Sequence, residues 1–206
     1  MKDPICNFWK EATPTVFGMT QHEKSENIDL QEQEEILGYL PDLKGKKVLE
    51  LASGIGRFTG RLAKQSDHVT TVDFASHFIE KNQEIHKKLS NIIYHVADAM
   101  DLSFDDASFD VVFINWLCIY LSEEETKLLF KRISKWLAKG GIFFFRESIR
   151  QTKSSTSGKY TAIYRTIEDY SYLAKKHFET INHDIVMTYL LQYKSTDQHY
   201  WLCQKN

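Results

Sequence analysis

Short apolar runs alternate with helical patterns along most of the chain. Five runs rich in β-branched and aromatic residues cover 46–51, 68–74, 91–98, 109–116 and 141–148. Each run has the length of a strand, and the segments between them place apolar residues at the spacing of amphipathic helices. Strands that alternate with helices form a parallel sheet with helices on its faces. The pattern therefore predicts an α/β fold with a doubly wound, mostly parallel sheet.

The helix expected after the fourth strand has well-defined ends. Ser122 and Glu125 have the spacing of a capping box, and Gly140 with Gly141 is expected to end the helix. Its apolar stripe is Leu128, Leu129, Ile133, Trp136 and Leu137. After the second strand, Ser76 is expected to cap a helix whose packed face is Phe78, Asn82, Ile85 and Leu89.

The end of the chain has a different pattern. Segments 184–194 and 198–205 both resemble strands, and the turn residues Ser195, Thr196 and Asp197 separate them. Two such runs joined by a short turn predict an antiparallel hairpin. We therefore expect the mostly parallel sheet to finish in an antiparallel hairpin.

Two segments lie outside the alternation of strands and helices. Residues 1–40 contain Trp9, Phe17 and Met19 ahead of an acidic helix, and 152–159 is basic and rich in serine. Either segment could cover a site as a lid. At 206 residues, the chain predicts a single domain over 1–206, in which 1–40 covers the substrate and 41–206 forms the core.

Composition and charge narrow the choice of function. With 26 Lys and Arg against 28 Asp and Glu, the formal charge is −2, which disfavours bulk nucleic-acid binding. The cysteines, Cys6, Cys118 and Cys203, are too few for a disulfide framework, and the eight histidines lack metal-ligand spacing, so no metal site is predicted. The sequence shows neither a signal peptide nor a membrane span, and we expect a cytoplasmic protein.

The strongest local signal is a strand that leads into a turn of small residues and then a helix, over 48–58. Gly54 and Gly56 are expected to let a ligand approach the backbone. The next glycine is Gly60, one residue later than a dinucleotide fingerprint requires. This spacing weakens the case for a nicotinamide cofactor.

Carboxylates at the strand ends favour a different cofactor. Glu50 lies beside the glycine turn and suits a cation, such as the ammonium and sulfonium of S-adenosylmethionine, better than a pyrophosphate. Asp73 closes the second strand, where a carboxylate can accept hydrogen bonds from both ribose hydroxyls. Asp98, after the third strand, is expected to meet the adenine amino group. Phe74 and Ala99 adjoin these positions as further expected contacts.

At these residues the chain resembles class I S-adenosylmethionine-dependent methyltransferases, which have a Rossmann-like fold. The glycine turn, Asp73, Asp98 and Asn115 follow in the order of that family, over about 46–148. The resemblance implies that Asn115 also contacts the cofactor. Ala52 departs from the family, which has its first glycine there, and its methyl group restricts φ.

A closer resemblance joins ELASGIGRFTGRLA, NWLCIYLSEEE and KWLAKGGIFFFRES to the first methyltransferase domain of phosphoethanolamine N-methyltransferases. It implies N-methylation of phosphoethanolamine, a phosphorylated amine of phospholipid biosynthesis. Arginine and tyrosine side chains would then hold the phosphate, and such forks and phenols suit a phosphate chemically. The expected substrate ligands are Arg146, Tyr160, Tyr164, Arg165 and Tyr170.

Alternatives remain open at the acceptor end. The run from Phe8 to Met19 also resembles the start of protein N-terminal methyltransferases, and both families place this segment, with Trp9, near the substrate. Tyr120 stands where that second family has a histidine, and it is our catalytic candidate to accept a proton from the amine. Another small amine or thiol, or a noncatalytic scaffold of the same fold, would also fit the sequence.

Overall fold

The computed structural model describes residues 3–20, 25–156 and 161–206. Seven strands form one sheet in the order β3-β2-β1-β4-β5-β9-β8. Their bounds are β1 (Lys47–Leu51), β2 (His68–Asp73), β3 (Ile92–Val96), β4 (Phe109–Asn115), β5 (Leu137–Ser148), β8 (Phe178–Ile185) and β9 (Gln198–Lys205). Strands β1 to β5 run parallel, and β9 is antiparallel to both neighbours, β5 and β8. This confirms the predicted fold class.

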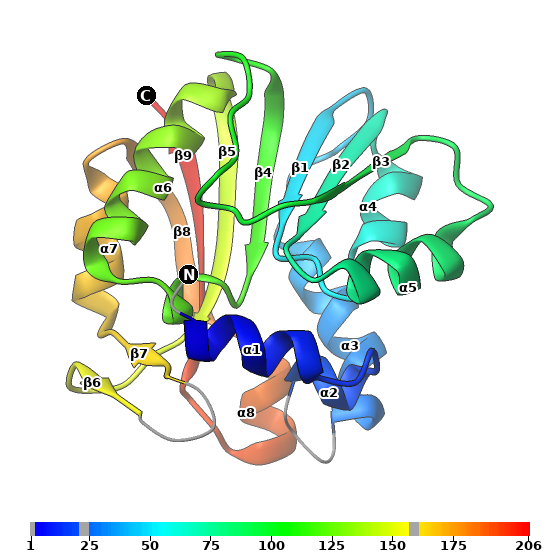
Figure 1. Ribbon diagram of the computed structural model, residues 1–206. Coiled ribbons are helices and arrows are strands. Elements are labelled where there is room, and N and C mark those ends of the chain that lie inside the picture. Colours follow the sequence, from blue (N-terminus) through cyan, green and yellow to red (C-terminus); the bar gives the residue numbers. More distant parts are fainter. Residues whose placement is uncertain (1–2, 21–24, 157–160) are drawn as a thin grey trace.

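Helices connect the strands and cover the sheet. They are α1 (Asp3–Glu11), α2 (Val16–Thr20), α3 (Ser25–Gly38), α4 (Thr59–Gln65), α5 (Ser76–His86), α6 (Glu123–Trp136), α7 (Ile167–Lys175), α8 (Met187–Tyr193) and the 3₁₀ turn η1 (Cys118–Tyr120). A two-stranded sheet, β6 (Ser154–Ser155) with β7 (Ile163–Tyr164), lies beside the main one. Figure 1 shows α6 and α7 beside β4 to β9, and α4 and α5 beside β1 to β3.

Successive strand residues pack into different cores. Leu49 and Phe145 join α6 and α7 in one buried cluster, whereas Val48 and Phe144 join α3, α4 and α8 in another. Neighbouring residues separate in this way because side chains alternate between the two faces of a strand. Strands buried on both faces explain the continuous apolar runs of the sequence.

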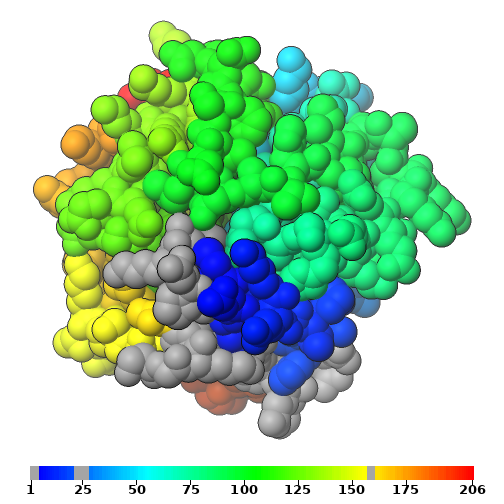
Figure 2. All heavy atoms as spheres, in the orientation of Figure 1, coloured from blue at the N-terminus to red at the C-terminus, as the bar shows by residue number. Residues whose placement is uncertain are grey.

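The strand order reverses between β1 and β4, which are neighbours in the sheet. Loops leave in opposite directions at such a switch point, and a crevice forms outside the carboxyl ends of the strands. Figure 1 shows α1 lying across this end of the sheet, and Figure 2 shows its atoms on the surface there. The N-terminal segment therefore covers the edge at which the sequence places its site.

The C-terminal hairpin exists, but its first strand was predicted wrongly. Strand β8 covers Phe178–Ile185, a mostly exposed and polar edge strand, and Met187–Tyr193 is the helix α8. The apolar run at 186–191 fits either structure by periodicity. Tertiary contacts decide for the helix, because the Glu35 carboxylate of α3 accepts from the backbone N–H of Met187 and, at 2.7 Å, that of Thr188.

Three further local predictions need correction. The capping box of Ser122 and Glu125 is present, but α6 ends at Trp136 and β5 begins at once, so Gly140 and Gly141 lie within the strand. The N-cap of α5 is Ala75 rather than Ser76, without a side-chain cap in the described structure. Ile85 and Leu128, expected on packed faces, are 49% and 42% exposed. Both side chains therefore lie at the edge of the buried face of their helix.

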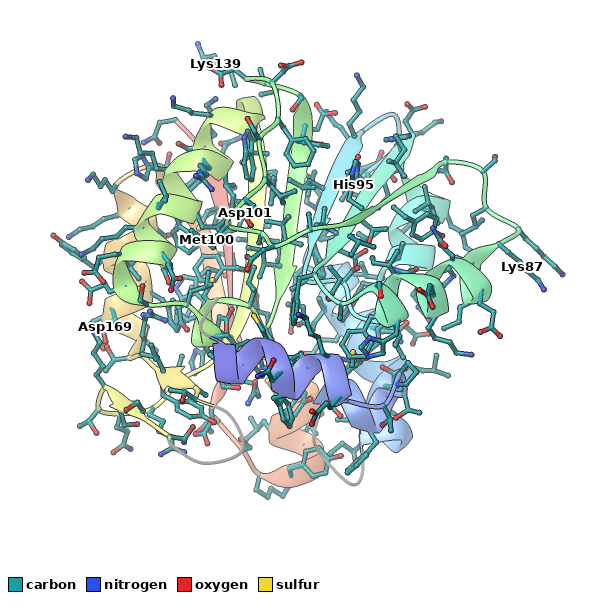
Figure 3. The ribbon with its side chains drawn as sticks, in the orientation of Figure 1. Lys87, His95, Met100, Asp101, Lys139 and Asp169 are labelled. Atoms are coloured by element: carbon teal, nitrogen blue, oxygen red, sulfur yellow. The ribbon has the colours of Figure 1, made fainter. Side chains whose placement is uncertain are left out.

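Lys139, at the top of the view in Figure 3, and Lys87, at its right, both project away from the body of the molecule. Within the described residues, none of the helices has the length and apolar character needed to cross a bilayer.

A buried ion network joins the N-terminal helix α3 to the sheet. The Glu32 carboxylate is paired with Arg57, beside the glycine turn, and with Arg146 of β5 at 3.1 Å. Arg57 also donates to Asp29 at 2.7 Å. Glu32 and Arg146 are fully buried. Charges taken out of water must be paired, so these contacts fix the position of α3.

Replacing Glu32 with Gln is expected to lower the free energy of unfolding by about 3 kcal/mol, because it leaves buried arginines short of a counter-charge. Urea denaturation measures the loss. Glu34→Gln is the matched control, since Glu34 lies on the same helix but is exposed, with a 3.5 Å contact to Arg61. The control should change stability by less than about 0.5 kcal/mol. Similar small losses in both variants would contradict the assigned role of the network.

Candidate functional site

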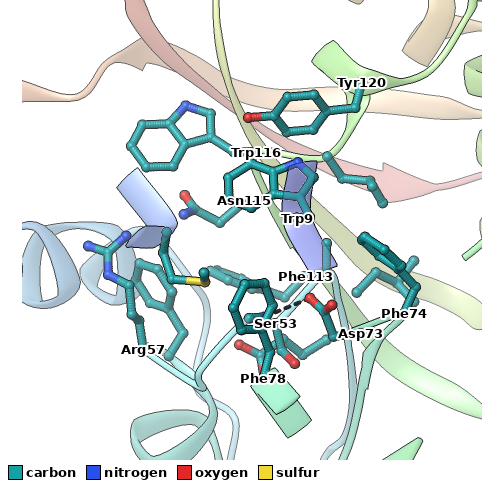
Figure 4. Close-up of a pocket in the computed structure, with 17 residues that line it drawn as sticks. Trp9, Ser53, Arg57, Asp73, Phe74, Phe78, Phe113, Asn115, Trp116 and Tyr120 are labelled. Carbon is teal, nitrogen blue, oxygen red and sulfur yellow. Dashed lines mark hydrogen bonds between the residues drawn. The ribbon is translucent and has the colours of Figure 1, made fainter. Parts of the chain in front are cut away.

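A pocket opens at the carboxyl ends of β1, β2 and β4, beneath α1 (Figure 4). It brings together seven of the residues predicted from the sequence: Trp9, Glu50, Gly54, Asp73, Phe74, Asn115 and Tyr120. Segments up to 111 positions apart in the sequence thus meet at one edge of the sheet, as parallel strand ends must.

The turn after β1 is built around backbone with positive φ. Ala52 has φ 54° and Gly54 has φ 54°, both in the left-handed region. The Gly54 N–H donates to an Asp73 carboxylate oxygen at 2.9 Å, which ties the turn to the end of β2. Glycine adopts this conformation readily, whereas alanine is strained there. Because Ala52 stands where the family has a glycine, the backbone in this wall of the pocket is strained.

Gly56, expected to let a ligand approach the backbone, packs closely against α5. Gly56 has φ 83° and is absent from the described pocket lining, and a Cβ there would lie 2.2 Å from the Asn82 side chain of α5. A Cβ at Gly60 would meet the His86 ring at 2.4 Å. His86 in turn bonds to the Gly56 carbonyl at 2.9 Å. Both glycines therefore let α5 approach the turn closely.

Two buried carboxylates face the pocket with raised pKa values. Burial raises the pKa of Glu50 to about 7, although hydrogen bonds from Thr59 and Thr71 oppose the shift. Burial also raises the pKa of Asp73 to about 6, against the hydrogen bonds donated by Gly54 and Ala75. Desolvation disfavours the charged form of an acid, and a bound cation would restore it. The pair therefore suits a cationic or hydroxyl-bearing ligand.

Three buried polar atoms of the lining lack a hydrogen-bond partner among the described residues. They are Glu50 Oε1, Ser53 Oγ and Asn115 Oδ1. Buried polar atoms are almost always hydrogen-bonded, so such a group of unpaired atoms needs an explanation. A polar ligand or water in the pocket supplies one.

Aromatic rings contribute a large part of the pocket lining. Trp9 of α1 packs edge to face against Tyr120 at 5.5 Å and against Phe78 at 6.5 Å, measured between ring centroids. Phe74 and Phe113 complete the lining (Figure 4). Aromatic faces stack on flat rings and attract cations. A lining that combines acidic groups with aromatic rings suits a ligand that carries both a cation and a flat ring.

The sequence analysis missed several lining residues, among them Met19, Arg57 and Trp116. Trp116 follows the predicted Asn115 and has φ 63°, which is unusual for a bulky residue. Its indole N–H donates to Ser148 Oγ at 3.0 Å. A strained aromatic residue directly after a strand is typical of a functional site, but its φ cannot be read from the sequence.

Asp98 and Ala99 lie at the next strand end but are absent from the described lining. The Asp98 carboxylate accepts from the Met100 N–H at 2.9 Å, and Ala99 packs in the core beside α6. The backbone N–H of Ala97 donates to the Asp73 carbonyl at 3.0 Å, which keeps this loop next to β2. Contact of Asp98 and Ala99 with a cofactor stays a proposal.

The structure places Arg146, predicted to hold a phosphate, outside the described lining of the pocket. Its guanidinium is fully buried, pairs with Glu32, and lies 3.3 Å from the ring centroid of Trp116. A side chain held in this way supports the pocket from behind. Contact of Arg146 with a phosphate stays a prediction.

Arg165 and Tyr170, also predicted as substrate ligands, are both fully buried and absent from the described lining. The Arg165 guanidinium donates to two backbone carbonyls and lies over the Tyr170 ring. Tyr164 is half-buried, with Arg150 over its ring at 4.2 Å. Tyr160 lies outside the described residues. Tyr160 and Tyr164 therefore stay as predicted phosphate ligands.

Comparison with known proteins identifies the domain that carries this pocket. Residues 48–141 match the family described as "Methyltransferase domain". Phosphoethanolamine N-methyltransferase 1 of Triticum aestivum is 35% identical over 216 residues, covering 97% of this chain and 43% of that protein. The chain thus spans less than half the length of this relative.

A solved structure and a second class of relative extend the comparison. Phosphoethanolamine N-methyltransferase 1 of Haemonchus contortus, in complex with phosphoethanolamine and S-adenosylhomocysteine, aligns with TM-score 0.87 and 29% identity over 97% of this chain and 48% of that one. N-terminal Xaa-Pro-Lys N-methyltransferase 1 of Rattus norvegicus is 28% identical over 155 residues, covering 70% of this chain and 69% of that protein.

Replacing Ala52 with Gly should raise the free energy of unfolding by about 1 kcal/mol, because relief of left-handed strain exceeds the added entropy of the unfolded chain. Chemical denaturation measures the gain. Ala107→Gly is the matched control outside the pocket, since Ala107 has φ 60°. Both variants should gain similar stability. A loss of stability at position 52 would show that the turn does not hold this conformation in solution.

Proposed function

The chain belongs to the class I S-adenosylmethionine-dependent methyltransferase family, and on this premise we propose that it transfers a methyl group to the nitrogen of phosphoethanolamine. The observation that supports the proposal most directly is the set of unpaired polar atoms of Glu50, Ser53 and Asn115 in an acidic and aromatic pocket. S-adenosylmethionine, the cofactor expected from the sequence, is also the cofactor of this methyltransferase family.

The residues of the pocket fit S-adenosylmethionine. We assign the cationic end of the cofactor to Glu50, the ribose hydroxyls to Asp73, and a polar contact to Asn115, all of which line the pocket. Gly54 brings the backbone close, and Phe74 offers a face for the adenine. A pocket with two acids of raised pKa favours a cation, because the cation lets both acids ionise at neutral pH.

When bound, S-adenosylmethionine supplies a methyl group on a cationic sulfur that leaves readily as a thioether. The protein must hold the amine in line and exclude water. Trp9 of α1 closes the pocket over Phe78 and Tyr120, which supports the proposal that residues 1–40 cover the substrate. The tertiary structure thus supplies orientation and desolvation with few charged groups.

The amine must lose a proton before it can accept a methyl group. A primary amine that resembles lysine, with pKa of about 10.4, is almost wholly protonated at neutral pH. We assign Tyr120 to accept a hydrogen bond from the ammonium group, and to take its proton when the phenol is ionised, because its ring lies in the pocket against Trp9. At the phosphate end we keep Tyr160 and Tyr164, and Arg150 over the Tyr164 ring adds a cation there.

A protein N-terminus is the second candidate acceptor. The rat relative matches this chain over 69% of its own length, which gives the alternative specific support. The two acceptors differ in charge, because phosphoethanolamine carries a phosphate and an Xaa-Pro-Lys terminus carries a lysine. Phospholipid biosynthesis and a cytoplasmic location stay predictions that accompany the first acceptor.

Asp73→Ala is expected to weaken S-adenosylmethionine binding by about 1.5–3 kcal/mol, the scale of hydrogen bonds to a charged group. That loss corresponds to roughly tenfold or more in Kd. Calorimetric titration measures it, with Asp67→Ala as control, since Asp67 is exposed and precedes β2 at its other end. Unchanged affinity in Asp73→Ala would mean that other groups hold the ribose. Absence of binding to the unmodified chain would favour a noncatalytic scaffold.

Methyl transfer from labelled cofactor tests the acceptor. We expect turnover of phosphoethanolamine, poor turnover of ethanolamine, and none of an Xaa-Pro-Lys peptide. Tyr120→Phe should lower kcat by about a hundredfold or more, the lower range of acid-base catalysis, without changing cofactor affinity. Tyr172→Phe on α7, at 61% exposure, is the matched control and should keep full activity. Turnover of the peptide without turnover of phosphoethanolamine would overturn the first acceptor and support a protein N-terminus instead.

A further inference from the structure

The turn that carries Tyr120 is too short to hold itself. The helix η1 spans three residues, and two backbone bonds close it, from Tyr120 to Leu117 at 3.0 Å and from Leu121 to Cys118 at 3.2 Å. Short 3₁₀ segments have weak hydrogen-bond geometry. Yet Leu117 and Tyr120 both line the pocket, so their placement depends on contacts from elsewhere in the fold.

Glu147 of β5 supplies the first set of contacts. Its carboxylate accepts from three consecutive backbone N–H groups, those of Leu117 at 3.0 Å, Cys118 at 2.6 Å and Ile119 at 3.3 Å. The side chain is fully buried. A buried carboxylate requires such donors, and successive N–H groups form a natural cradle for an anion. The start of η1 is thereby fixed to the end of β5.

Arg165 supplies the second set of contacts. Its guanidinium donates to the carbonyls of Cys118 and Leu121, each at 2.7 Å, from a fully buried position. The planar fork of arginine can reach two acceptors at once, which the ammonium of lysine cannot do in the same geometry. Glu147 therefore binds N–H groups of the turn, and Arg165, which carries the opposite charge, binds its carbonyl groups.

We propose that Glu147 and Arg165 are positioning residues for methyl transfer, which hold η1 so that Tyr120 faces the pocket while neither touches substrate nor cofactor. The role of Tyr120 rests on the proposed function, whereas the clamp on η1 rests on the contacts alone. Both side chains are absent from the described lining, which is consistent with action through the turn.

Glu147→Gln tests the activity side of the proposal. We expect kcat to fall by roughly tenfold to a hundredfold, the scale of a small misplacement of a reacting group. Cofactor affinity should not change. In a Tyr120→Phe background the same substitution should cause no further loss of kcat, because both changes remove the same contribution, that of the Tyr120 hydroxyl. Arg165→Lys, which loses the fork, should lower kcat in the same direction.

Glu125→Gln is the matched control. Glu125 caps α6 by accepting from the Ser122 N–H at 2.7 Å, just beyond the same turn, and the substitution should leave kcat unchanged. Additive losses in the double variant, or weaker cofactor binding by Glu147→Gln, would mean that Glu147 merely supports the fold and would overturn the proposal.

Hydrogen exchange of the unmodified chain tests the clamp when a variant fails to fold. The amides of Cys118 and Ile119 should exchange as slowly as those of β4, because a buried carboxylate holds them. Exchange as fast as that of the exposed residues Asp105 and Asp106 would overturn the clamp. If the unmodified chain transfers no methyl group to any acceptor, the proposed function fails, and protected amides would still support the clamp.

Discussion

The buried carboxylate of Glu32 holds the molecule together at its functional edge. It lies between Arg57, which adjoins the glycine turn, and Arg146, whose guanidinium supports the Trp116 ring. Each of these charges is out of water, so each depends on the others for compensation. Because Glu32 belongs to α3, a helix outside the matched residues 48–141 is tied to Arg57, which lines the pocket.

The same principle is repeated around the pocket. Asp73 fixes the glycine turn through the Gly54 N–H, and Glu147 fixes the turn that carries Tyr120. Loops have no ladder of their own to satisfy their backbone groups, so buried side chains from neighbouring strands satisfy them. The pocket walls are therefore tied to the sheet by buried hydrogen bonds, which suits a reaction that needs orientation and exclusion of water.

The end of β5 shows how strand alternation serves this purpose. Glu147 points to η1, whereas its neighbours Arg146 and Ser148 both contact Trp116. Side chains of successive strand residues leave on opposite faces, so three adjacent residues can hold one loop from two directions. The sequence motif that resembles the phosphoethanolamine enzymes thus includes residues that support the site as well as residues that line it.

Local pattern by itself determined the five parallel strands, the capping box at the start of α6, and the strand-end positions of Glu50 and Asp73, because periodicity and chain order fix which residues share an edge of a parallel sheet. The expected role of Asn115 came from the resemblance to the family. Local pattern could not decide between strand and helix at 186–191, where the Glu35 carboxylate of a distant helix caps α8. Nor could it tell a ligand-binding arginine from a buried one. Arg146 and Arg165 have the chemistry that a phosphate needs, but tertiary contacts place them among buried backbone and acidic partners. The type of a side chain sets which contacts it can make. Only the packed structure decides whether that side chain is buried against protein partners or open to a ligand from solvent.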